Sequence, residues 1–360
     1  MIKTALQKLH LKNFRCFSSE TIDFDGPLVL IEGINGSGKT SLLEALHYTC
    51  YLRSFRTHLP RDLIKFGTTG FFIQTTFSDS TISIGCTGTK KHIKINQKPI
   101  SSYKELRDAF KIVTVTEDDV AIVKESPEKR RTFIDHALLL EKPELITLFK
   151  EYKVHLKQRN ALLQKHTVNQ EELIIWTKKI WILSKQIQNE RRTFLQTLEA
   201  TAHKFIEQEW KEPCTLNFAY QPKYMQEQQT WEQFEAFWQQ GIMFKEQQLR
   251  RSMFGAHLDD FALTFNGKPA KLYSSRGQQK LIVLMLKMAQ IQQLQAGQGS
   301  DTQLTFLLDD FMTDFDPLIA QKLIALCLGL KVQLIFTSPL NDSLEKKLLS
   351  KYNVHIVNIS

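Results

Sequence analysis

The feature that most constrains this chain is a glycine-rich run near its start, Gly33-Ile34-Asn35-Gly36-Ser37-Gly38-Lys39-Thr40. It satisfies the pattern G-x-x-x-x-G-K-[S/T] in full. It follows the apolar run Leu28–Ile31, typical of a buried strand, and leads into a helical apolar rhythm. Such a loop binds phosphate, because backbone N–H groups and a helix N-terminus favour an anion. We predict a nucleotide-binding P-loop of these eight residues and Ser41, in which Lys39 reaches the β- and γ-phosphates and Thr40 binds Mg²⁺.

A pair of carboxylates near the other end of the chain supplies a second element of such a site. The apolar run Leu304–Leu308 has the composition of a buried strand and leads directly into Asp309 and Asp310. This is the Walker B arrangement, in which the first aspartate holds Mg²⁺ and the second can orient the attacking water. A strand followed by a capping aspartate would look the same, but the P-loop favours the functional interpretation. We predict Asp309 as a metal ligand and Asp310, together with Lys39, as a catalytic residue.

A third segment, Ser275-Arg276-Gly277-Gln278-Gln279, opens an apolar helical stretch ahead of the paired aspartates. Serine and glycine in this place can cap a helix without any further role. The pattern S-x-G-Q before a helix is also the signature of ABC-type ATPases, where it binds the γ-phosphate held by the opposite subunit. Ser275, Gly277 and Gln278 are therefore predicted to contact nucleotide in a dimer. Kinases and GTPases differ, because their P-loops act alone.

The middle of the chain differs in composition from both ends. No glycine occurs over 89–240, and good helix formers dominate, with apolar residues at helical spacing. We predict an inserted helical arm at 126–252 and a split head made of 1–125 plus 253–360. Within the head, short alternating runs over 70–100 predict a small antiparallel sheet. The aromatic residues of the arm are expected to form its core rather than a stacking surface for DNA.

Composition limits the class of protein. The chain has 47 Lys and Arg against 38 Asp and Glu, a net charge of +9 and a pI of about 9.1. This balance favours polyanionic partners, although a merely soluble basic surface would give the same total. No apolar run is long enough to span a bilayer, and the N-terminus leads into a strand-like pattern rather than a signal peptide. The five cysteines form no C-x-x-C pair, which suits a reducing cytoplasm and disfavours zinc.

Together these motifs resemble the RecF family, and the similarity covers nearly the whole chain. The stretches that carry it are Asn13-Phe14-Arg15, the P-loop with Leu42-Leu43-Glu44-Ala45-Leu46, Arg53-Ser54-Phe55-Arg56-Thr57, Val123-Lys124-Glu125-Ser126-Pro127 with Arg130-Arg131 and Phe133-Ile134-Asp135, Ser275 to Lys280, the paired aspartates, and Thr313-Asp314-Phe315-Asp316. The chain also departs from the family pattern. Gly255-Ala256-His257-Leu258-Asp259-Asp260 lacks the proline and arginine of G-P-H-R-D-D, and Lys280 stands where the family has arginine. We interpret the chain as a divergent member.

The resemblance implies an α/β fold, an ABC/SMC-type P-loop ATPase head with a small antiparallel sheet and an inserted helical lobe. It implies that the chain binds ATP and Mg²⁺, hydrolyses ATP slowly with stimulation by DNA, and forms a homodimer when ATP binds. It also implies a cytoplasmic role in recombinational gap repair at single-strand/double-strand DNA junctions. There RecF proteins help RecO and RecR to load RecA.

Further site residues follow from the resemblance and from charge. Asp316 stands in the place of the D-loop, and Thr337 ends the strand predicted at Val332–Phe336, so both are predicted to lie against the nucleotide. Basic residues after the first predicted helix are candidate DNA contacts, as is a lysine ribbon further along. They are Arg53, Arg56, Arg61 and Lys65 in the first group and Lys90, Lys91, Lys94 and Lys98 in the second. Either group could equally be a solvated face.

Two other functions fit the same motifs. An ATP-gated DNA clamp without significant hydrolysis would share every one of them, and the protein would then be chiefly a binding module. Another soluble ABC-type ATPase, such as the ATPase subunit of a transporter, is a weaker alternative. A transporter's nucleotide domain is expected to keep a glutamate after Walker B and a histidine switch, whereas this chain has Asp310 and Thr337 in those places.

Overall fold

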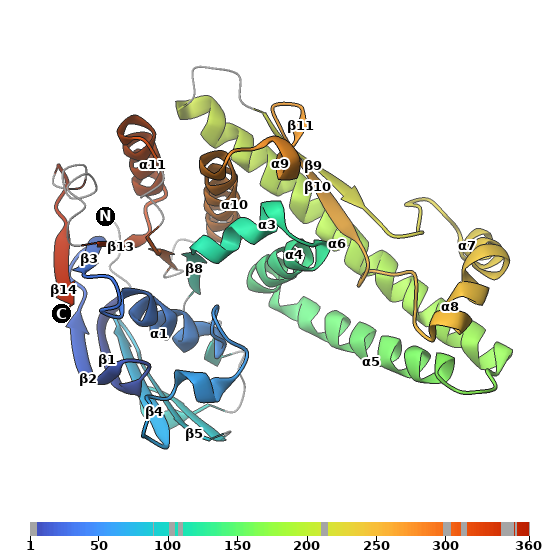
Figure 1. Ribbon diagram of the computed structural model, residues 1–360, viewed down its shortest axis with the longest axis horizontal. Coiled ribbons are helices and arrows are strands. Elements are labelled where there is room, and N and C mark those ends of the chain that lie inside the picture. Colours follow the sequence, from blue (N-terminus) through green and yellow to red (C-terminus); the bar gives the residue numbers. More distant parts are fainter. Residues whose placement is uncertain are drawn as a thin grey trace. The chain divides into compact units, whose positions relative to one another are not determined.

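The structure is a computed structural model of the 360-residue chain (Figure 1). It describes residues 6–88, 90–100, 105–106, 111–209, 215–297, 304–310, 315–339, 349 and 351–359. The chain forms two compact units. Unit 1 comprises Met1–Val120 and Ser275–Ser360, and unit 2 comprises Ala121–Ser274.

Unit 1 contains a five-stranded sheet in the order β14-β3-β13-β12-β8, and every pairing in it is parallel. The strands are β3 (Leu28–Gly33), β8 (Lys111–Val115), β12 (Leu304–Leu308), β13 (Gln333–Pro339) and β14 (His355–Ile359). The inner strands are buried on both faces, which explains their continuous apolar runs. Because parallel strands end at a common edge, the motifs after β3 and β12 are brought to the same side of the sheet.

A second sheet of unit 1 is antiparallel, in the order β2-β1-β4-β5-β6-β7. Its strands are β1 (Leu6–Phe14), β2 (Phe17–Asp23), β4 (Gly70–Phe77), β5 (Thr81–Thr87), β6 (Lys90–Ile95) and β7 (Lys98–Pro99). The antiparallel strands predicted over 70–100 are confirmed. The sheet is larger than expected, because β1 pairs with β4 from Leu6 opposite Phe77 to Lys12 opposite Phe72.

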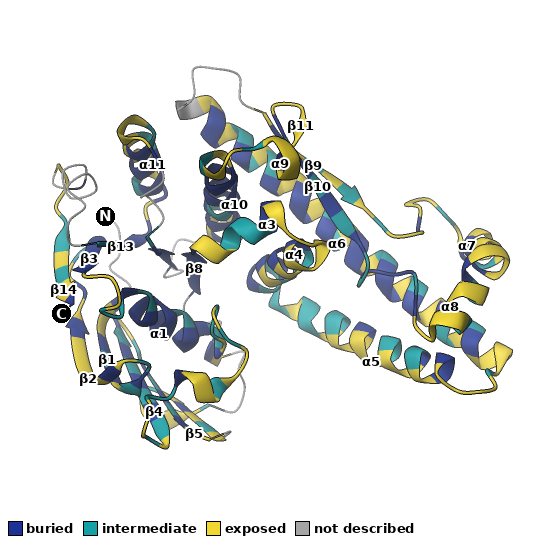
Figure 2. Ribbon diagram, viewed as in Figure 1, coloured by how far each residue is buried: buried dark blue, intermediate teal, exposed yellow. Residues whose placement is uncertain are grey.

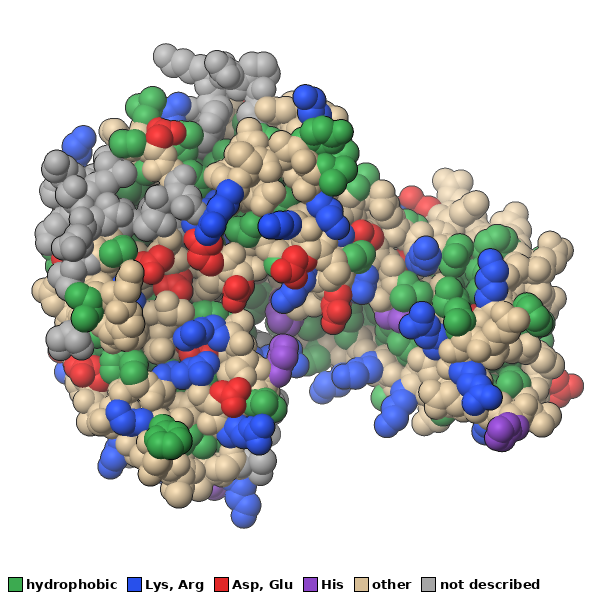
Figure 3. All heavy atoms as spheres, in the orientation of Figure 1, with side chains coloured by type: hydrophobic (Ala, Val, Ile, Leu, Met, Phe, Trp, Pro, Cys, Tyr) green, Lys and Arg blue, Asp and Glu red, His purple; other side chains and the backbone are tan. Residues whose placement is uncertain are grey.

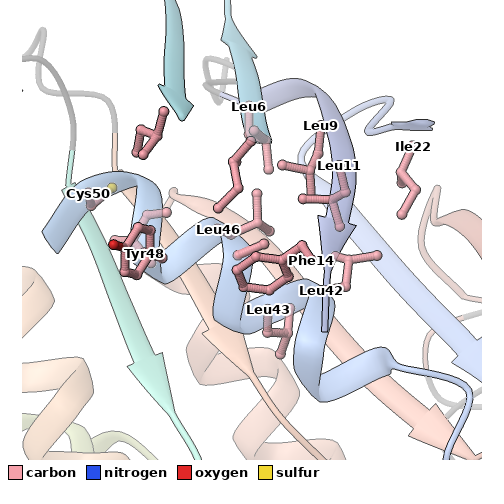
Figure 4. Close-up of a cluster of buried hydrophobic side chains, with 14 of the residues drawn as sticks. Leu6, Leu9, Leu11, Phe14, Ile22, Leu42, Leu43, Leu46, Tyr48 and Cys50 are labelled. Atoms are coloured by element: carbon pink, nitrogen blue, oxygen red, sulfur yellow. The ribbon is translucent and has the colours of Figure 1, made fainter. Parts of the chain in front are cut away.

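Helix α1 (Lys39–Tyr51) joins the two sheets of unit 1 in one core. It packs against β1 and β4 of the antiparallel sheet and against β3 and β8 of the parallel sheet. Figure 4 shows Leu42 and Leu46 of α1 beside Leu9 and Leu11 of β1, all fully buried. The helix is therefore covered along most of its length (Figure 2), and the P-loop before it is held on a rigid element.

In the described part of unit 1, the remaining elements are α10 (Arg276–Gly297), α11 (Pro317–Gly329) and the 3-10 turns η1 (Pro60–Leu63) and η2 (Glu117–Val120). Helix α10 packs against β8 and η2. Its run Leu281–Leu286 is buried on all sides, which explains an apolar stretch longer than one helix face requires.

Unit 2 is built on helices, as predicted. They are α3 (Ala121–Lys124), α4 (Pro127–Glu141), the 3-10 turn η3 (Pro143–Leu145), α5 (Ile146–Leu163) and the 40-residue α6 (Gln170–Glu209). Proline at the first position starts α4, because it has no N–H to leave unsatisfied there. Tyr152, Ile180, Leu183 and Ile187 lie in the core between α5 and α6, so the apolar stripe is packing surface, as expected.

After β9 (Leu216–Gln221), unit 2 continues with α7 (Trp231–Phe237), a π-helical turn η4 (Trp238–Ile242) and α8 (Met243–Leu249). A fully buried ion pair joins α8 to α5: Arg159 donates to both carboxylate oxygens of Glu246, at 3.0 and 2.6 Å. The Arg159 guanidinium also lies 4.9 Å from the centre of the Phe254 ring. No helix in the described part of either unit is long and apolar enough to cross a membrane.

The division into units differs from the one inferred from sequence. Unit 2 includes a three-stranded sheet of β9 (Leu216–Gln221), β10 (Asp260–Phe265) and β11 (Lys268–Pro269), followed by α9 (Ala270–Tyr273). Strand β10 pairs with β9 over its whole length, from Asp260 opposite Gln221 to Phe265 opposite Leu216. This pairing keeps 253–274 with the helical unit, although the sequence-based division assigned that segment to the head.

Candidate functional site

The P-loop connects β3 to α1 and depends on glycine at defined positions. Gly36 and Gly38 have φ of 90° and 104°, where a side chain is strained. A Cβ on Gly38 would lie 2.7 Å from Cys16 Sγ and 2.7 Å from a ring carbon of Phe17. A Cβ on Gly33 would lie 2.7 Å from the carbonyl oxygen of Ile359. The backbone of the loop can close only with glycine at these positions.

Two side chains inside the loop have the properties of an anion site. The Lys39 side chain is buried, and Nζ donates to the carbonyl oxygens of Gly33 at 2.9 Å and Ile34 at 3.3 Å. The hydroxyl of Ser37 is also buried and has no hydrogen-bond partner among the described residues. A cation and an unsatisfied donor therefore lie at the N-terminus of α1, and both fit a polyphosphate.

Asp309 lies directly after β12 and is joined to two threonine hydroxyls. Thr40 Oγ1 and Thr337 Oγ1 donate to the same oxygen, Oδ1, at 3.1 and 3.0 Å. Burial raises the pKa of the Asp309 carboxyl, the two hydroxyls lower it, the charge of Asp310 raises it and that of Arg56 lowers it. The structure thus brings Thr40, Asp309 and Thr337 together, although Thr40 and Asp309 are 269 residues apart.

The pair Thr40 and Asp309 fits a magnesium ion. Magnesium prefers oxygen ligands and usually takes only one or two from protein, with the rest from phosphate and water. No group of three or more His, Cys, Asp and Glu residues gathers anywhere in the described ranges, so a metal held entirely by side chains has no candidate there. A hydroxyl and a buried carboxylate beside the P-loop are the donor set expected for a metal bound with nucleotide.

Asp310 follows Asp309 at the same edge of the sheet, and its backbone leaves the extended conformation of the strand. Its φ is 43°, in the left-handed region, and its N–H donates to Thr337 Oγ1 at 2.8 Å. The Thr337 hydroxyl also lies 3.3 Å from Asp310 Oδ1. Asp309 is fixed through its backbone, because its N–H donates to Val115 O of β8 at 2.9 Å. Thr337 therefore orients both aspartates, a role that the sequence did not indicate.

Ser275 and Gln278 form a reciprocal cap at the start of α10. Ser275 N donates to Gln278 Oε1 at 2.9 Å, and Gln278 N donates to Ser275 Oγ at 3.3 Å. The capping alternative considered for this segment is thus present in the structure. The cap also fixes the direction of the Ser275 hydroxyl, which can still donate to another acceptor. Asp316 is likewise a cap, accepting from Leu318 N and Ile319 N at 3.0 Å, while Thr313 and Asp314 lie outside the described residues.

Glu117 of η2 links the signature segment to the parallel sheet, and sequence reasoning missed it. Its carboxylate pairs with Arg276 Nη2 at 3.1 Å and with Nζ of the buried Lys280. Nearby, Lys287 Nζ lies 3.1 Å from Asp119 Oδ1.

Glu44 of α1 forms hydrogen bonds with two of the segments that carry the family resemblance, those of Arg15 and Ser54. It is fully buried and accepts from Arg15 Nε at 2.7 Å and Arg15 Nη2 at 2.6 Å. The Ser54 hydroxyl also donates to it. The hydrogen bonds to Glu44 raise the pKa of Arg15, so its guanidinium stays charged. The helix after the P-loop is thereby tied to the segment that carries Arg53 and Arg56.

The candidate DNA contacts fall into two kinds. Arg53, Arg56 and Arg61 are exposed, whereas Lys65 Nζ donates to the carbonyl oxygen of Cys16 at 2.6 Å. Lys91 of the ribbon is likewise engaged, donating to Leu52 O at 3.1 Å and lying over the Tyr48 ring. Figure 3 shows Lys and Arg side chains scattered over the face drawn rather than gathered in one field.

The segment that departs from the family pattern, 255–260, joins the helices of unit 2. Asp259 accepts from Tyr220 Oη at 2.6 Å and Gln188 Nε2 at 3.0 Å. Asp260 forms a two-pronged pair with Arg130, at 2.6 and 3.0 Å. Leu258, in the place of the arginine, is half-buried, and the Asp259 and Asp260 contacts are made without it.

A P-loop and paired aspartates at one edge of a parallel sheet, with a signature helix in the same unit, define an ABC/SMC-type ATPase head. Residues 8–249 match the protein-family model described as AAA domain. Two similar relatives are each described as DNA replication and repair protein RecF. That of Ruminiclostridium cellulolyticum is 32% identical, with 86% of this chain and 87% of the relative covered. That of Acetivibrio thermocellus is 30% identical, covering 86% and 87%.

Solved structures show the same fold. The recombination mediator protein RecF-ATP of the RecFOR pathway has a TM-score of 0.82 at 24% identity, covering 95% of this chain and 94% of that one. The Smc head domain from Pyrococcus furiosus has a TM-score of 0.56 at 14% identity, covering 99% and 94%. The chain belongs to the RecF family, as the motifs predicted, and is a divergent member of it. The predicted fold class is confirmed.

Proposed function

We propose that the chain is an ATP-dependent DNA-binding ATPase of recombinational gap repair. The observation that carries the proposal is the cluster of Thr40, Asp309 and Thr337 beside the P-loop, in a chain of the RecF family. This cluster supports a site for ATP and Mg²⁺ rather than a nucleotide-free scaffold, because a buried carboxylate on two hydroxyls needs a cation to offset its burial.

In this proposal the P-loop residues 33–40 and Ser41 hold the phosphates. Lys39 leaves the carbonyl oxygens of Gly33 and Ile34 and pairs with the β- and γ-phosphates, whose charge attracts the ammonium more strongly. The Ser37 hydroxyl gains a partner in the same step. Bound Mg²⁺, held by Thr40 and Asp309, would neutralise charge that develops on the phosphate oxygens.

Asp310 is the proposed general base. Its carboxylate lies beside the Thr337 hydroxyl and can orient a water for attack on the γ-phosphate. Aspartate is one carbon shorter than the glutamate common at this place in transporters, so its reach is reduced. Slow hydrolysis follows from this geometry, and we assign Asp310 and Lys39 as the catalytic residues.

The signature segment requires a second copy of the chain. Ser275, Gly277 and Gln278 at the N-terminus of α10 would bind the γ-phosphate held by the partner, and Asp316 would lie against the same interface. The cap between Ser275 and Gln278 supports this, because it presents the serine hydroxyl on a fixed helix end. ATP thus drives formation of the homodimer.

We propose that the dimer binds DNA at single-strand/double-strand junctions. Its partners there are RecO and RecR, and together they load RecA onto the DNA. The net charge of +9 supports a polyanionic partner. The relatives named for DNA replication and repair support DNA as the substrate, and we place this role in the cytoplasm. We also propose that unit 1, which carries the P-loop and the paired aspartates, acts on ATP.

A second candidate is an ATP-gated DNA clamp in which hydrolysis is insignificant. The short side chain of Asp310 and its engagement by Thr337 favour it, since a base held by a hydroxyl is less available to water. Single-turnover hydrolysis on gapped DNA, with sedimentation in the same buffer, tests both candidates. ATP-dependent dimers that release no phosphate within the lifetime of the DNA complex would select the clamp. The ATPase proposal fails if the chain binds no ATP.

A further inference from the structure

Phe66 is the most exposed large apolar side chain in the described part of the molecule, with a relative exposure of 101%. It lies in the loop of residues 53–69 between α1 and β4, called here the basic loop. Single exposed apolar residues are common on protein surfaces and need no function by themselves. Phe66 differs because hydrogen bonds fix the turn that carries it and because the same loop is rich in cationic residues.

The turn that carries Phe66 is fixed by hydrogen bonds. Thr68 N donates to Lys65 O at 3.1 Å and Thr68 Oγ1 to the same oxygen at 2.8 Å. Gly67 has φ of 80°, which places Phe66 at the second position of a type II turn. No atom lies within 4 Å of a Cβ built on Gly67, so the turn projects into solvent.

The base of this turn is anchored to the end of β1. Lys65 N donates to Asn13 O at 2.9 Å, and Lys65 Nζ donates to Cys16 O at 2.6 Å. Arg15 N donates to Leu63 O at 2.8 Å. These bonds occupy Lys65 as an anchor rather than as a DNA contact. A rigidly presented aromatic ring loses little entropy when it stacks on a ligand.

The charges of the basic loop favour nucleic acid as the ligand. The loop has four cationic residues, Arg53, Arg56, Arg61 and Lys65, and one acidic residue, Asp62. Asp62 is engaged within the loop, since Thr57 Oγ1 donates to it at 2.5 Å. The Arg61 side chain is 78% exposed, and its Nε lies 3.9 Å from Asp62 Oδ1, a long surface pair that a phosphate can replace. An exposed aromatic ring and exposed arginines on one loop are the combination that binds unpaired bases and their phosphates.

The basic loop is also connected to the nucleotide site. Ser54 donates to Glu44 on the helix that follows the P-loop. A ligand on the loop and nucleotide in the P-loop can therefore influence each other through one rigid element.

We propose that Phe66 stacks on an unpaired base and so directs the chain to the junction between single-stranded and double-stranded DNA. The proposal rests on the DNA-binding function proposed above and assigns the residue that selects the junction. Arg61 neutralises a neighbouring phosphate. A blunt duplex offers no unpaired base, so it gains only the phosphate contacts.

The test uses the full chain with ATP and two DNAs of equal length, a blunt duplex and one with a recessed end. The first unpaired base of the second DNA is 2-aminopurine, whose fluorescence falls when it stacks. Phe66→Ala should weaken binding to the recessed DNA about fivefold to a hundredfold, with unchanged affinity for the duplex. It should also abolish the quenching, and Phe66→Trp should keep both.

Phe244→Ala is the matched control, since Phe244 of α8 is an exposed phenylalanine (66%) of unit 2. It should leave both affinities unchanged. Equal losses on both DNAs for Phe66→Ala, or no loss, would overturn the assignment of Phe66. The same holds if that variant loses only dimerisation, which would make Phe66 a protein contact. If the unaltered chain binds neither DNA with ATP, the proposed function itself fails.

Discussion

Arg15 and Glu44 form a two-pronged ion pair, at 2.7 and 2.6 Å, between the turn after β1 and the middle of α1. Glu44 is fully buried, whereas the side chain of Arg15 is 20% exposed. The pair joins the antiparallel sheet to the helix that begins at the P-loop. The ion pair therefore stabilises unit 1 and helps to fix the position of the basic loop.

Glu44→Gln should lower the free energy of unfolding by about 2–4 kcal/mol, because it leaves Arg15 facing a neutral group. Thermal or urea unfolding measures the change. Asp23→Asn breaks the exposed pair of Lys8 and Asp23 and should cost less than about 0.5 kcal/mol. Equal small effects from both variants would mean that the Arg15–Glu44 pair contributes no more than a surface pair.

Lys39→Ala should abolish ATP binding at micromolar nucleotide, a loss of at least about thirtyfold in affinity. The variant removes the one buried cation of the loop while the backbone amides remain. Equilibrium binding of a labelled nucleotide measures it, and Lys12→Ala on β1 is the control. Unchanged affinity in Lys39→Ala would remove the P-loop assignment.

Asp310→Asn should leave nucleotide affinity unchanged, stop hydrolysis and trap the ATP-bound dimer. The amide keeps the shape of the side chain but cannot take a proton from water. Phosphate release and sedimentation with ATP measure the two effects, with Asp25→Asn as the control. Hydrolysis at the unaltered rate would place the base elsewhere.

Arg61→Ala should reduce the slope of log affinity for DNA against log salt by about one unit, uniformly across sequences. The reason is that one phosphate contact releases about one counterion. Lys351→Ala changes the same net charge on another exposed segment and should leave the slope as it is. A slope that is insensitive to both variants would argue against the basic loop as a phosphate contact.

His257 should make unit 2 less stable in acid. Burial lowers its pKa to about 4, from an unfolded value of 6.5. The unfolded chain therefore binds a proton between pH 6.5 and 4 that the folded chain refuses, so stability falls as the pH is lowered through that window. About 2 kcal/mol should be lost through this group between pH 7 and pH 5. In His257→Gln, the loss between the two pH values should be smaller by that amount.

The nucleotide motifs were predictable because they are local. The sequence around Gly33–Thr40 and Leu304–Asp310 combines strand, turn and carboxylates in a fixed order, and the order alone implies the chemistry. The family, the fold class and the helical arm followed from the same patterns. Glu44 and Glu117 were not assigned, because their partners lie in segments whose proximity depends on the tertiary fold.

Strand β10 shows the same limit for domain boundaries. Its sequence is an ordinary alternating strand, so nothing in it tells whether β9 or a strand of the head is its neighbour. Ser275 shows another limit, since one hydroxyl can cap a helix and also face a ligand. The two roles can be told apart only from the atoms that the hydroxyl contacts, and the sequence does not give those contacts.

The Thr40–Asp309 contact has a consequence for how the protein is made. Its two halves leave the ribosome 269 residues apart, with the whole of unit 2 synthesised between them. A nascent chain therefore carries the residues of the phosphate loop long before the aspartate that would hold its metal exists. In the proposed function, the nucleotide site is complete only once synthesis has passed β13, which carries Thr337.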